Sequence, residues 1–470
     1  MKNKPENFVR NVEHALSLSD LKSTIRRTTD KAEQQRSIAV ERFPNFDKAR
    51  LQGQKIKDHV IQHIGHYLET FERNAVANGA IVHWAETGEE ASKIVVNICR
   101  EHNAKSITRS KSMLGEEIGL SEALDEHGFD RIETDLAEHI IQLAGDPPSH
   151  IVWPAMHRSR EDVVRLFREN HAQPTKSKEI EDLVKSSRRE LRQKFLDADI
   201  GISGANFLLA DSGSSCTVTN EGNAELTTTP PKVHIVTAGI EKLVPSMAHA
   251  MPLVRLLTRS ATGGEITQYI TFHNGAKRLN DADGPEQTHI VLVDNGRTKM
   301  LNNGMQEMLR CIRCGACMNH CVVYKHIGGH AYGGVYPGPM GSVLSPHMIG
   351  LDKAHKQTHA CTLNGRCEEV CPVNIPLPKL LRSLRARAWK KKYDPIVNRF
   401  AIRVFTQLAL RPKLFQLLSS FGVIAMRLFK RGSWISWLPM AGGWTRNRDL
   451  PAPPSSTFMQ QLKNKQREPK

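Results

Sequence analysis

Seven of the nine cysteines in this chain of 470 residues lie between Cys311 and Cys371, in two short runs. The first run has the spacing C-x2-C-x2-C-x3-C and contains Cys311, Cys314, Cys317 and Cys321. The second run has the spacing C-x5-C-x3-C-P and contains Cys361, Cys367 and Cys371. The bacterial two-cluster pattern uses C-x2-C-x2-C-x3-C-P, and the fourth cysteine of each run binds the other cluster. The spacing therefore predicts two iron–sulfur clusters, which restricts how residues 311–371 can fold.

The two-cluster pattern also predicts which sulfur atoms bind each cluster. Three closely spaced thiolates bind one side of a cluster, and a distant cysteine supplies the fourth ligand. The predicted ligands of cluster 1 are Cys311, Cys314, Cys317 and Cys371. The predicted ligands of cluster 2 are Cys321, Cys361 and Cys367. The crossing ligands would tie the two runs together across an insert of 39 residues.

Two other uses of the cysteines fit the sequence less well. Zinc also binds Cys-x-x-Cys pairs, but a run of four cysteines that ends in x3-C suits zinc poorly. A disulfide framework usually has an even number of cysteines spread along a secreted chain, whereas most of these are clustered. The pattern indicates metal binding in a reducing compartment. We expect Cys99 and Cys216, which lie outside the runs, to be buried as small hydrophobic residues.

The second run departs from the two-cluster pattern at one position. Asn364 stands where the second cysteine of that run is expected. Cluster 2 is then either a three-iron cluster or a four-iron cluster whose fourth iron is bound by Asn364, solvent or substrate. An open iron site is what Lewis-acid catalysis needs, but it is also what a weakened cluster looks like. We favour a redox or structural role for cluster 2.

Hydrophobic patterning divides the chain into four regions. Residues 1–70 are predicted to form polar helices, and residues 71–298 a mixed α/β domain. Short apolar runs alternate there with helices of about ten or more residues, which favours a largely parallel sheet. These runs are AIVHWA, SITRS, GFDRIETD, SHIVWPAM, ANFLLAD, CTVTN and KVHIVTAGI. Residues 299–385 carry the cysteine runs on short helical pieces, and residues 386–470 are predicted to be a basic helical extension with a disordered tail.

The positive charge of the chain is concentrated near its C-terminus. The net charge is +16, and between Pro376 and Arg448 sixteen Lys and Arg residues accompany a single acid, Asp394. The predicted helices over residues 396–429 interleave apolar and basic residues, which suits docking to partner proteins first and contact with an anionic membrane second. Since no nucleic-acid-reading motif accompanies these helices, we predict no binding to nucleic acid.

The sequence also indicates where the protein acts in the cell. The N-terminal lysines are not followed by the apolar stretch of a secretory signal. No window reaches the roughly 18 uncharged apolar residues of a spanning helix. We expect a cytoplasmic protein. The basic helices also allow a peripheral position on the inner face of the membrane.

Taken together, the motifs of the chain resemble those of the lactate-utilization protein B family, the iron–sulfur subunit of a three-protein L-lactate oxidation system. The resemblance covers nearly the whole chain. The matching motifs are SKSMLGEEIGLSEAL, ETDLAEHIIQLAGDPPSHIVWPAMH, ADIGISGANFLLADSGS, TNEGN, DNGR, LRCIRCGACMNHC, YKHIGGHAYG and EVCPVNIPLPKLL. Many members of the family have a cysteine at the position of Asn364.

The resemblance implies a fold and a function. The α/β domain should be similar to the group of CoA transferases and sugar-phosphate isomerases, and an all-α two-cluster ferredoxin domain should follow it. Cluster 1 is expected to be [4Fe-4S], and cluster 2 [4Fe-4S] or [3Fe-4S]. The implied activity is oxidation of L-lactate to pyruvate with two partners, the A-like and C-like proteins, and with the respiratory chain as electron acceptor. Since no GxGxxG unit indicates NAD or flavin in this chain, the electrons should enter through a partner.

One alternative places catalysis in the α/β domain itself. TNEGN puts Glu221 in a tight turn, and in the similar CoA-transferase fold a glutamate in such a turn is the nucleophile. Glu221 is therefore the candidate catalytic residue of a carboxylate- or acyl-processing enzyme, although a turn held by Asx hydrogen bonds explains the same residues. In SKSM, Ser112 is predicted to cap a helix, although a helix N-terminus beside Lys111 would also attract an anion. His330 and Tyr332, in GGHAYGG, either cover a cluster or form a flexible loop.

Overall fold

The structure is a computed structural model that describes residues 4–439, 441–445 and 448–467. The chain divides into two compact units, Met1–Lys390 and Lys391–Lys470. The first unit contains the α/β region and both cysteine runs, and the second contains the basic C-terminal helices. The two units are described separately below.

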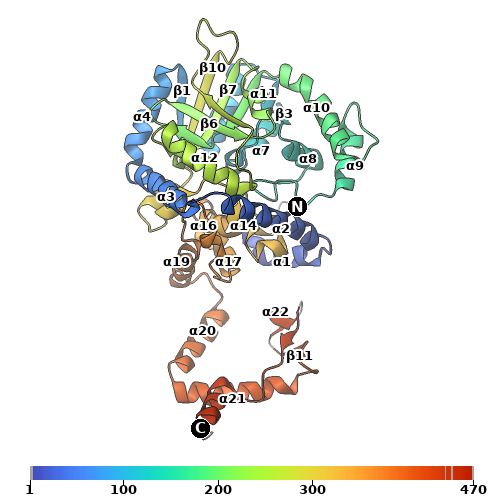
Figure 1. The fold of residues 1–470 in the computed structure, drawn as a ribbon, viewed down its shortest axis with the longest axis vertical. Helices are drawn as coiled ribbons and strands as arrows, with labels where there is room; N and C mark the ends of the chain where they lie inside the picture. Colours follow the sequence, from blue (N-terminus) through green and yellow to red (C-terminus); the bar gives the residue numbers. More distant parts are fainter. Residues whose placement is uncertain (1–3, 440, 446–447, 468–470) are drawn as a thin grey trace. The chain divides into compact units, whose positions relative to one another are not determined.

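A six-stranded sheet forms the centre of the α/β region, with the strand order β1-β10-β7-β4-β2-β3 (Figure 1). All neighbouring strands run parallel; in register, Ile202 pairs with Ile235, and Ile235 pairs with His289. The strands are β1 (Ala80–Ala85), β2 (Ser106–Arg109), β3 (Asp130–Glu133), β4 (Ile200–Gly204), β7 (Val233–Gly239) and β10 (Gln287–Val293). The predicted parallel sheet is confirmed, and β4 and β10 are strands that the apolar runs did not include.

A smaller four-stranded sheet packs nearby, in the order β8-β5-β6-β9. Its strands are β5 (Phe207–Leu209), β6 (Ser214–Thr219), β8 (Leu243–Val244) and β9 (Tyr269–His273). Strand β6 is antiparallel to both β5 and β9. The runs ANFLLAD and CTVTN therefore belong to a separate sheet, because the tight turn that joins them forces adjacent antiparallel pairing.

The apolar run SHIVWPAM is not a strand, although its composition suggested one. The backbone N–H of Ser149 donates to the carbonyl of Pro154 at 3.0 Å. The His150 Nδ1 accepts from the backbone N–H groups of Val152 and Trp153 at 3.0 and 3.1 Å. These local bonds, together with a proline that cannot donate, close the segment into a turn whose apolar side chains face the interior.

Helices surround the main sheet. The N-terminal helices are α1 (Phe8–Ser17), α2 (Leu21–Glu41), α3 (Phe46–Gln62) and α4 (Ile64–Ala77). The helical pattern over Leu51–Phe71 is interrupted at His63, between α3 and α4. The remaining helices of the α/β region are α5 (Gly88–Glu101), α6 (Met113–Glu117), α7 (Leu120–Glu126), α8 (Leu136–Ala144), α9 (Arg160–Asn170), α10 (Ile180–Leu196), α11 (Asn223–Thr228), η2 (Ile240–Lys242), α12 (Met247–Ala261) and α13 (Thr298–Leu301). Helix α5 begins at Thr87, whose side chain accepts from the Glu90 N–H, as an N-cap does.

The cysteine-bearing region folds as short helices that share a core with the N-terminal helices. They are η3 (Gln306–Arg310), α14 (Ala316–Asn319), α15 (Tyr324–Ile327), η4 (His330–Tyr332), α16 (Gly338–Met348), α17 (Leu351–His359), α18 (Arg366–Glu369) and α19 (Leu377–Lys390). Helices α1 and α2 lie against α14, α15 and α17 (Figure 1). Phe8 and Ile25 are buried in one apolar cluster with Met308 and Leu380, so about 300 residues of intervening sequence are closed by this packing.

The second unit consists mainly of the amphipathic helices α20 (Ile396–Ala409) and α21 (Pro412–Leu428). Pro412 starts α21 and separates it from α20, which the sequence pattern joined into one long stretch. The segment after residue 449, whose composition predicted disorder, contains the helix α23 (Phe458–Arg467). Among the described residues, no helix has the length and apolarity that crossing a membrane requires.

Candidate metal centre

The two cysteine runs fold as structural copies that are offset by 50 residues. Each loop contains a residue and then a glycine with positive φ: Arg313 (60°) and Gly315 (77°) in the first, Leu363 (58°) and Gly365 (85°) in the second. A four-residue helix follows each glycine, α14 in the first copy and α18 in the second. Asn364 therefore occupies the loop position that Cys314 occupies in the first copy.

The first group of sulfur atoms gathers around one apolar cavity. The cysteines that line this cavity are Cys311, Cys314, Cys317 and Cys371. The remaining lining is largely apolar and includes Ile151, Met340 and Val373. Burial raises the pKa of the Cys314 thiol to about 12, and the neighbouring Cys371 and Cys311 contribute to the shift. Cys371 thus joins the first run although it belongs to the second.

The second group contains the other three cysteines of the runs. Burial raises the pKa of the Cys367 thiol to about 12, with further contributions from its neighbours Cys361 and Cys321. The buried phenol of Tyr332 lies in the same electrostatic neighbourhood, since burial and then Cys321 raise its pKa. The GGHAYGG segment therefore packs against this group and does not form an open loop.

Backbone N–H groups point at some of these sulfur atoms. Leu363 donates to the Cys361 Sγ at 3.3 Å, and Ile375 donates to the Cys371 Sγ at 3.4 Å. Such bonds favour the thiolate over the thiol, and they are the kind of bond that tunes a bound iron–sulfur cluster. The donor groups of the loops therefore suit metal-bound thiolates.

The donor set fits multi-iron clusters better than single zinc ions. Across residues 4–439, 441–445 and 448–467, no three Cys, His, Asp or Glu side chains are arranged to hold one metal ion. A structural zinc site needs its sulfur atoms about 2.3 Å from a common centre. Four cysteines that line one apolar cavity are instead the arrangement expected for ligands of a single cluster.

Asn364 has a local structural role in the second loop. The side chain is exposed, and its Oδ1 accepts from the backbone N–H of Arg366 at 3.2 Å. This bond to the residue two positions on is an Asx turn. The asparagine thus stabilises the same loop shape that the first copy forms around a cysteine.

Cationic side chains from distant helices hold the cysteine loops in place. Arg36, from α2, donates to the carbonyl of Val370 at 2.9 Å, and Arg50, from α3, donates to the carbonyl of Cys371 at 3.0 Å. Arg385, from α19, donates to the carbonyl of Cys361 at 2.5 Å. Sequence reasoning missed Arg36 and Arg50, because nothing in a polar N-terminal helix signals contact with residues more than 300 positions away.

Arg313 joins the first cysteine loop to the α/β region. Its Nη2 lies 3.2 Å from the Glu241 Oε1, and its guanidinium carbon lies 4.5 Å from the centre of the Tyr336 ring. Arg297 lies 2.5 Å from the other oxygen of Glu241 and also pairs with Glu117 at 2.8 Å. Despite burial, the pKa of Glu241 is lowered to about 2, because Arg297 and Arg313 stabilise its charge.

A second cavity, of about 360 Å³, lies at the carboxyl ends of the parallel strands and reaches Arg313. The segments that follow β2, β3, β4 and β7 all contribute to it, as is usual for ligand sites in parallel sheets. Its polar lining includes Lys111, Ser112, Asp135, Asn206, Glu221, Lys242, Arg297 and Arg313. Trp153, Tyr336 and several aliphatic side chains complete the wall. This cavity lies within the same compact unit as the cysteine loops.

Glu221 lines the cavity from the turn that the sequence predicted. Gly222 has a φ of 72°, and the Asn220 Oδ1 accepts from the Gln268 N–H at 3.2 Å. The Glu221 Oε2 accepts from the Leu136 N–H at 3.2 Å, at the start of α8. Loss of solvation and the nearby Asp135 raise the pKa of Glu221 to about 7. The Glu221 carboxyl therefore keeps its proton to a higher pH than an ordinary glutamate does.

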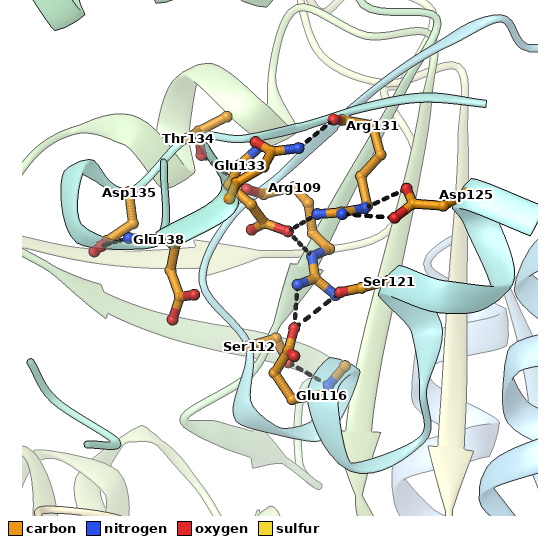
Figure 2. A network of polar contacts seen from close by, with 12 residues as sticks. Arg109, Ser112, Glu116, Ser121, Asp125, Arg131, Glu133, Thr134, Asp135 and Glu138 are labelled. Carbon is orange, nitrogen blue, oxygen red and sulfur yellow. Dashed lines mark hydrogen bonds and ion pairs between the residues drawn. The ribbon is translucent and has the colours of Figure 1, made fainter. Parts of the chain in front are cut away.

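A buried ion network fixes the cavity wall after β2 (Figure 2). Arg109 lies between Glu133, at 2.6 Å, and Glu116, to which it also donates. Arg131 pairs with Glu133 at 2.7 Å and with Asp125 at 3.0 Å. Because Arg109 ends β2 and Glu116 lies in α6, the network sets the path of residues 110–112 between them.

The sequence predictions for Ser112 and for the two outlying cysteines agree with the structure. The Ser112 side chain accepts from the Gly115 N–H and caps α6, while the Lys111 ammonium donates to the carbonyl of Val152 at 2.7 Å. Cys99 and Cys216 are both fully buried in apolar clusters. Burial raises the pKa of each thiol to about 12, and neither belongs to the two cysteine groups.

Comparison with known proteins gives consistent matches along the chain. Residues 68–293 match the LUD domain, and residues 307–375 match the 4Fe-4S dicluster domain. The lactate utilization protein B of Bacillus licheniformis is 40% identical over 471 residues, which cover 100% of this chain and 98% of that protein. The protein of the same name from Bacillus subtilis strain 168 is 40% identical over 454 residues, covering 96% and 95%. The one from Macrococcus caseolyticus is 39% identical over 465 residues, covering 98% and 97%.

Proposed function

The chain belongs to the lactate utilization protein B family, and from that premise we propose that it is the iron–sulfur electron-transfer subunit of a multi-subunit system that oxidises L-lactate to pyruvate. The relatives carry lactate utilization in their names, and the 4Fe-4S dicluster match makes this chain an iron–sulfur protein. The observation that carries the electron-transfer role is the convergence of Cys371 with the first cysteine run around one apolar cavity.

The proposed ligands follow the two sulfur groups. Cluster 1 is held by Cys311, Cys314, Cys317 and Cys371, and cluster 2 by Cys321, Cys361 and Cys367. The common cavity of the first four and the mutual electrostatic neighbourhood of the last three support this division. We propose [4Fe-4S] for cluster 1, and [4Fe-4S] or [3Fe-4S] for cluster 2, where Asn364 replaces a thiolate.

When bound, the clusters supply one-electron transfer, and the chain's own residues provide the surroundings. Oxidation of L-lactate to pyruvate releases two electrons and two protons, so a two-cluster chain has capacity for both electrons. Apolar side chains such as Ile151 and Val373 exclude water from the first site. Arg36 and Arg50 place positive charge beside the loops, which favours the more negative, reduced state.

The proposed partners are the A-like and C-like proteins of the lactate system, and the proposed final acceptor is the respiratory chain. The basic second unit supports docking, because Ile396, Phe400 and Phe421 expose large apolar side chains beside Arg399 and Arg403. Exposed apolar area with a charged rim is typical of interaction surfaces. A peripheral position at the inner face of the membrane is the second use that we propose for this surface.

Anaerobic purification followed by iron and sulfide counting and EPR tests the proposed function. Two four-iron clusters give about eight irons per chain. About seven irons with an oxidised three-iron EPR signal would instead indicate one three-iron cluster, as expected for cluster 2 if it lacks a fourth thiolate. The variant Cys371→Ala should lose cluster 1, and the matched control Cys99→Ala should keep both clusters. Zinc in place of iron, or equal iron loss in the two variants, would contradict the proposal.

A second candidate function uses Glu221 as the reacting group of a carboxylate- or acyl-processing enzyme. Its raised pKa and its position in the cavity favour this candidate. The variant Glu221→Gln separates the two functions. Lactate-dependent electron transfer that survives in this variant supports the first function, and loss of activity with both clusters retained supports the second.

A further inference from the structure

The cavity at the carboxyl ends of the parallel strands, here called the strand-end cavity, is lined by four cations. Among the residues that the structure describes, Lys242 is the one of these four whose charged group forms neither a hydrogen bond nor an ion pair. Lys242 ends η2, directly after β7, and its side chain lines the cavity. The other three behave differently: Lys111 donates to Val152, Arg297 pairs with Glu117 and Glu241, and Arg313 pairs with Glu241. The Lys242 ammonium therefore has donors to offer to a ligand.

The charge around Lys242 is not balanced by the carboxylates nearby. The charged groups at this corner are the four cations Lys57, Lys242, Arg297 and Arg313 and the two acids Glu117 and Glu241; Lys57, Arg297 and Glu241 are fully buried, and Lys242 is half-buried. Lys57 satisfies its ammonium with the carbonyls of Glu241 and Leu243 at 2.5 and 3.2 Å. Two positive charges thus remain, and a half-buried ammonium group without a partner favours a ligand of opposite charge.

The negative charge of the thiolates at proposed cluster 1 would compensate part of this excess positive charge, namely that of Arg313. Arg313 lies in the loop between Cys311 and Cys314 and contacts the Tyr336 ring. Lys242 instead opens into a cavity of about 360 Å³, which is within the size range of sites for small organic ligands. The cavity also offers the hydroxyl and amide groups of Ser112, Asn206 and Thr237, which suit the oxygens of a polar ligand.

We propose that the strand-end cavity binds a short organic carboxylate, that Lys242 pairs with the carboxylate group, and that Arg313 forms the wall between this ligand and cluster 1. The choice of a 2-hydroxy or 2-oxo acid as ligand rests on the proposed function, whereas the anion site rests on Lys242 and the cavity.

A ligand in the strand-end cavity would lie close to cluster 1. Ile151 lines both the strand-end cavity and the cavity of the first cysteine group. Arg313 lines the strand-end cavity and lies in the loop between Cys311 and Cys314. A carboxylate bound at Lys242 would therefore lie one layer of side chains away from cluster 1. Binding there should perturb the EPR signal of cluster 1 more than that of cluster 2.

The test is isothermal titration calorimetry of the intact, cluster-loaded protein with L-lactate, with pyruvate and with lactamide, which lacks the negative charge. The variant is Lys242→Met. The matched control is Lys232→Met, because Lys232 is exposed and precedes the amino end of the same strand β7. Iron and sulfide counts on every sample separate ligand binding from loss of the clusters.

We expect saturable binding of at least one of the two acids, with a Kd that rises about tenfold or more in Lys242→Met, as expected when a charged hydrogen bond is lost, and that stays unchanged in Lys232→Met. Lactamide should bind more weakly than L-lactate by a similar factor. Absence of saturable binding, an unchanged Kd in Lys242→Met, or equal binding of lactamide would overturn the proposal. In each of those cases full iron content would leave the electron-transfer function standing.

Discussion

The Arg313 guanidinium lies 3.2 Å from the Glu241 carboxylate. Arg313 belongs to the loop between the first two cysteines, and Glu241 follows a central strand of the parallel sheet. This ion pair is almost completely buried, since the two side chains are 10% and 3% exposed. The cysteine loops and the sheet are therefore parts of one site, in which charge changes on one side are felt on the other.

Replacing Arg313 should lower the midpoint potential of cluster 1. Removal of a buried positive charge beside the cysteine loop destabilises the reduced, more negative state, by an amount on the order of tens of millivolts. Redox titration followed by EPR measures the shift in Arg313→Gln. The charge-preserving variant Arg313→Lys should stay nearer the wild-type potential, and an equal shift in both variants would mean that packing rather than charge is responsible.

Restoring the missing thiolate should complete cluster 2. Asn364 occupies the loop position of Cys314 in the repeated backbone, so Asn364→Cys places a sulfur where a ligand is expected. The variant should contain about one more iron than the wild type if cluster 2 is a three-iron cluster, with loss of the oxidised three-iron EPR signal.

The variant Thr362→Cys, two positions earlier, is the control for the added thiol, because Thr362 is also exposed in this loop but does not occupy the ligand position. Its iron content and EPR spectrum should match the wild type. If Asn364→Cys leaves both the iron count and the spectrum unchanged, cluster 2 already has four irons and does not recruit this position.

Glu138 should make the protein less stable as the pH rises. Figure 2 draws no hydrogen bond or ion pair to the buried Glu138 carboxyl. Burial raises the pKa of this carboxyl to about 8; Lys111 lowers the pKa, and the nearby acids Glu133, Asp135 and Glu116 raise it further. The unfolded state loses this proton near pH 4.5, whereas the folded state keeps it up to about pH 8. The contribution of the protonated carboxyl to the free energy of unfolding is therefore fully present below pH 4.5 and is lost as the pH rises through about 8. The slope is at most about 1.4 kcal/mol per pH unit.

Denaturant unfolding at pH 6 and at pH 8.5 measures this effect. The variant Glu138→Gln cannot ionise, so its stability relative to the wild type should increase between these two pH values by on the order of a few kcal/mol. Glu181→Gln changes an exposed glutamate and should show no such increase. A parallel pH dependence of wild type and Glu138→Gln would show that Glu138 is ionised in the folded protein.

Removal of residues 396–448, most of the second unit, should abolish association with the partner proteins and leave the clusters intact. The exposed apolar and basic residues of α20 and α21 are the docking surface that we propose. Deleting residues 396–448 should prevent co-purification of the A-like and C-like proteins while iron content stays unchanged. Flotation with anionic liposomes, with and without the same segment, measures membrane contact, and flotation that depends on the segment would favour the membrane instead.

The sequence by itself determined the parts of this protein that are local. The spacing within each cysteine run predicted two clusters, and the two-cluster pattern grouped Cys371 with the first run, because in that pattern the last cysteine of each run binds the other cluster. Alternating strands and helices predicted the parallel sheet, and the glycine of TNEGN predicted the turn at Glu221. These features depend on neighbouring residues, whose chemistry is visible in a short window.

Only the tertiary structure decided what surrounds those features. Arg36 and Arg50 reach the cysteine loops from the N-terminal helices, and SHIVWPAM became a turn because its backbone bonds closed locally. The unpaired Lys242 looks ordinary in the sequence, since a lysine between a glutamate and a leucine carries no signal. Its significance arises from packing, which leaves the half-buried ammonium group without a hydrogen bond or an ion pair and places a cavity in front of it.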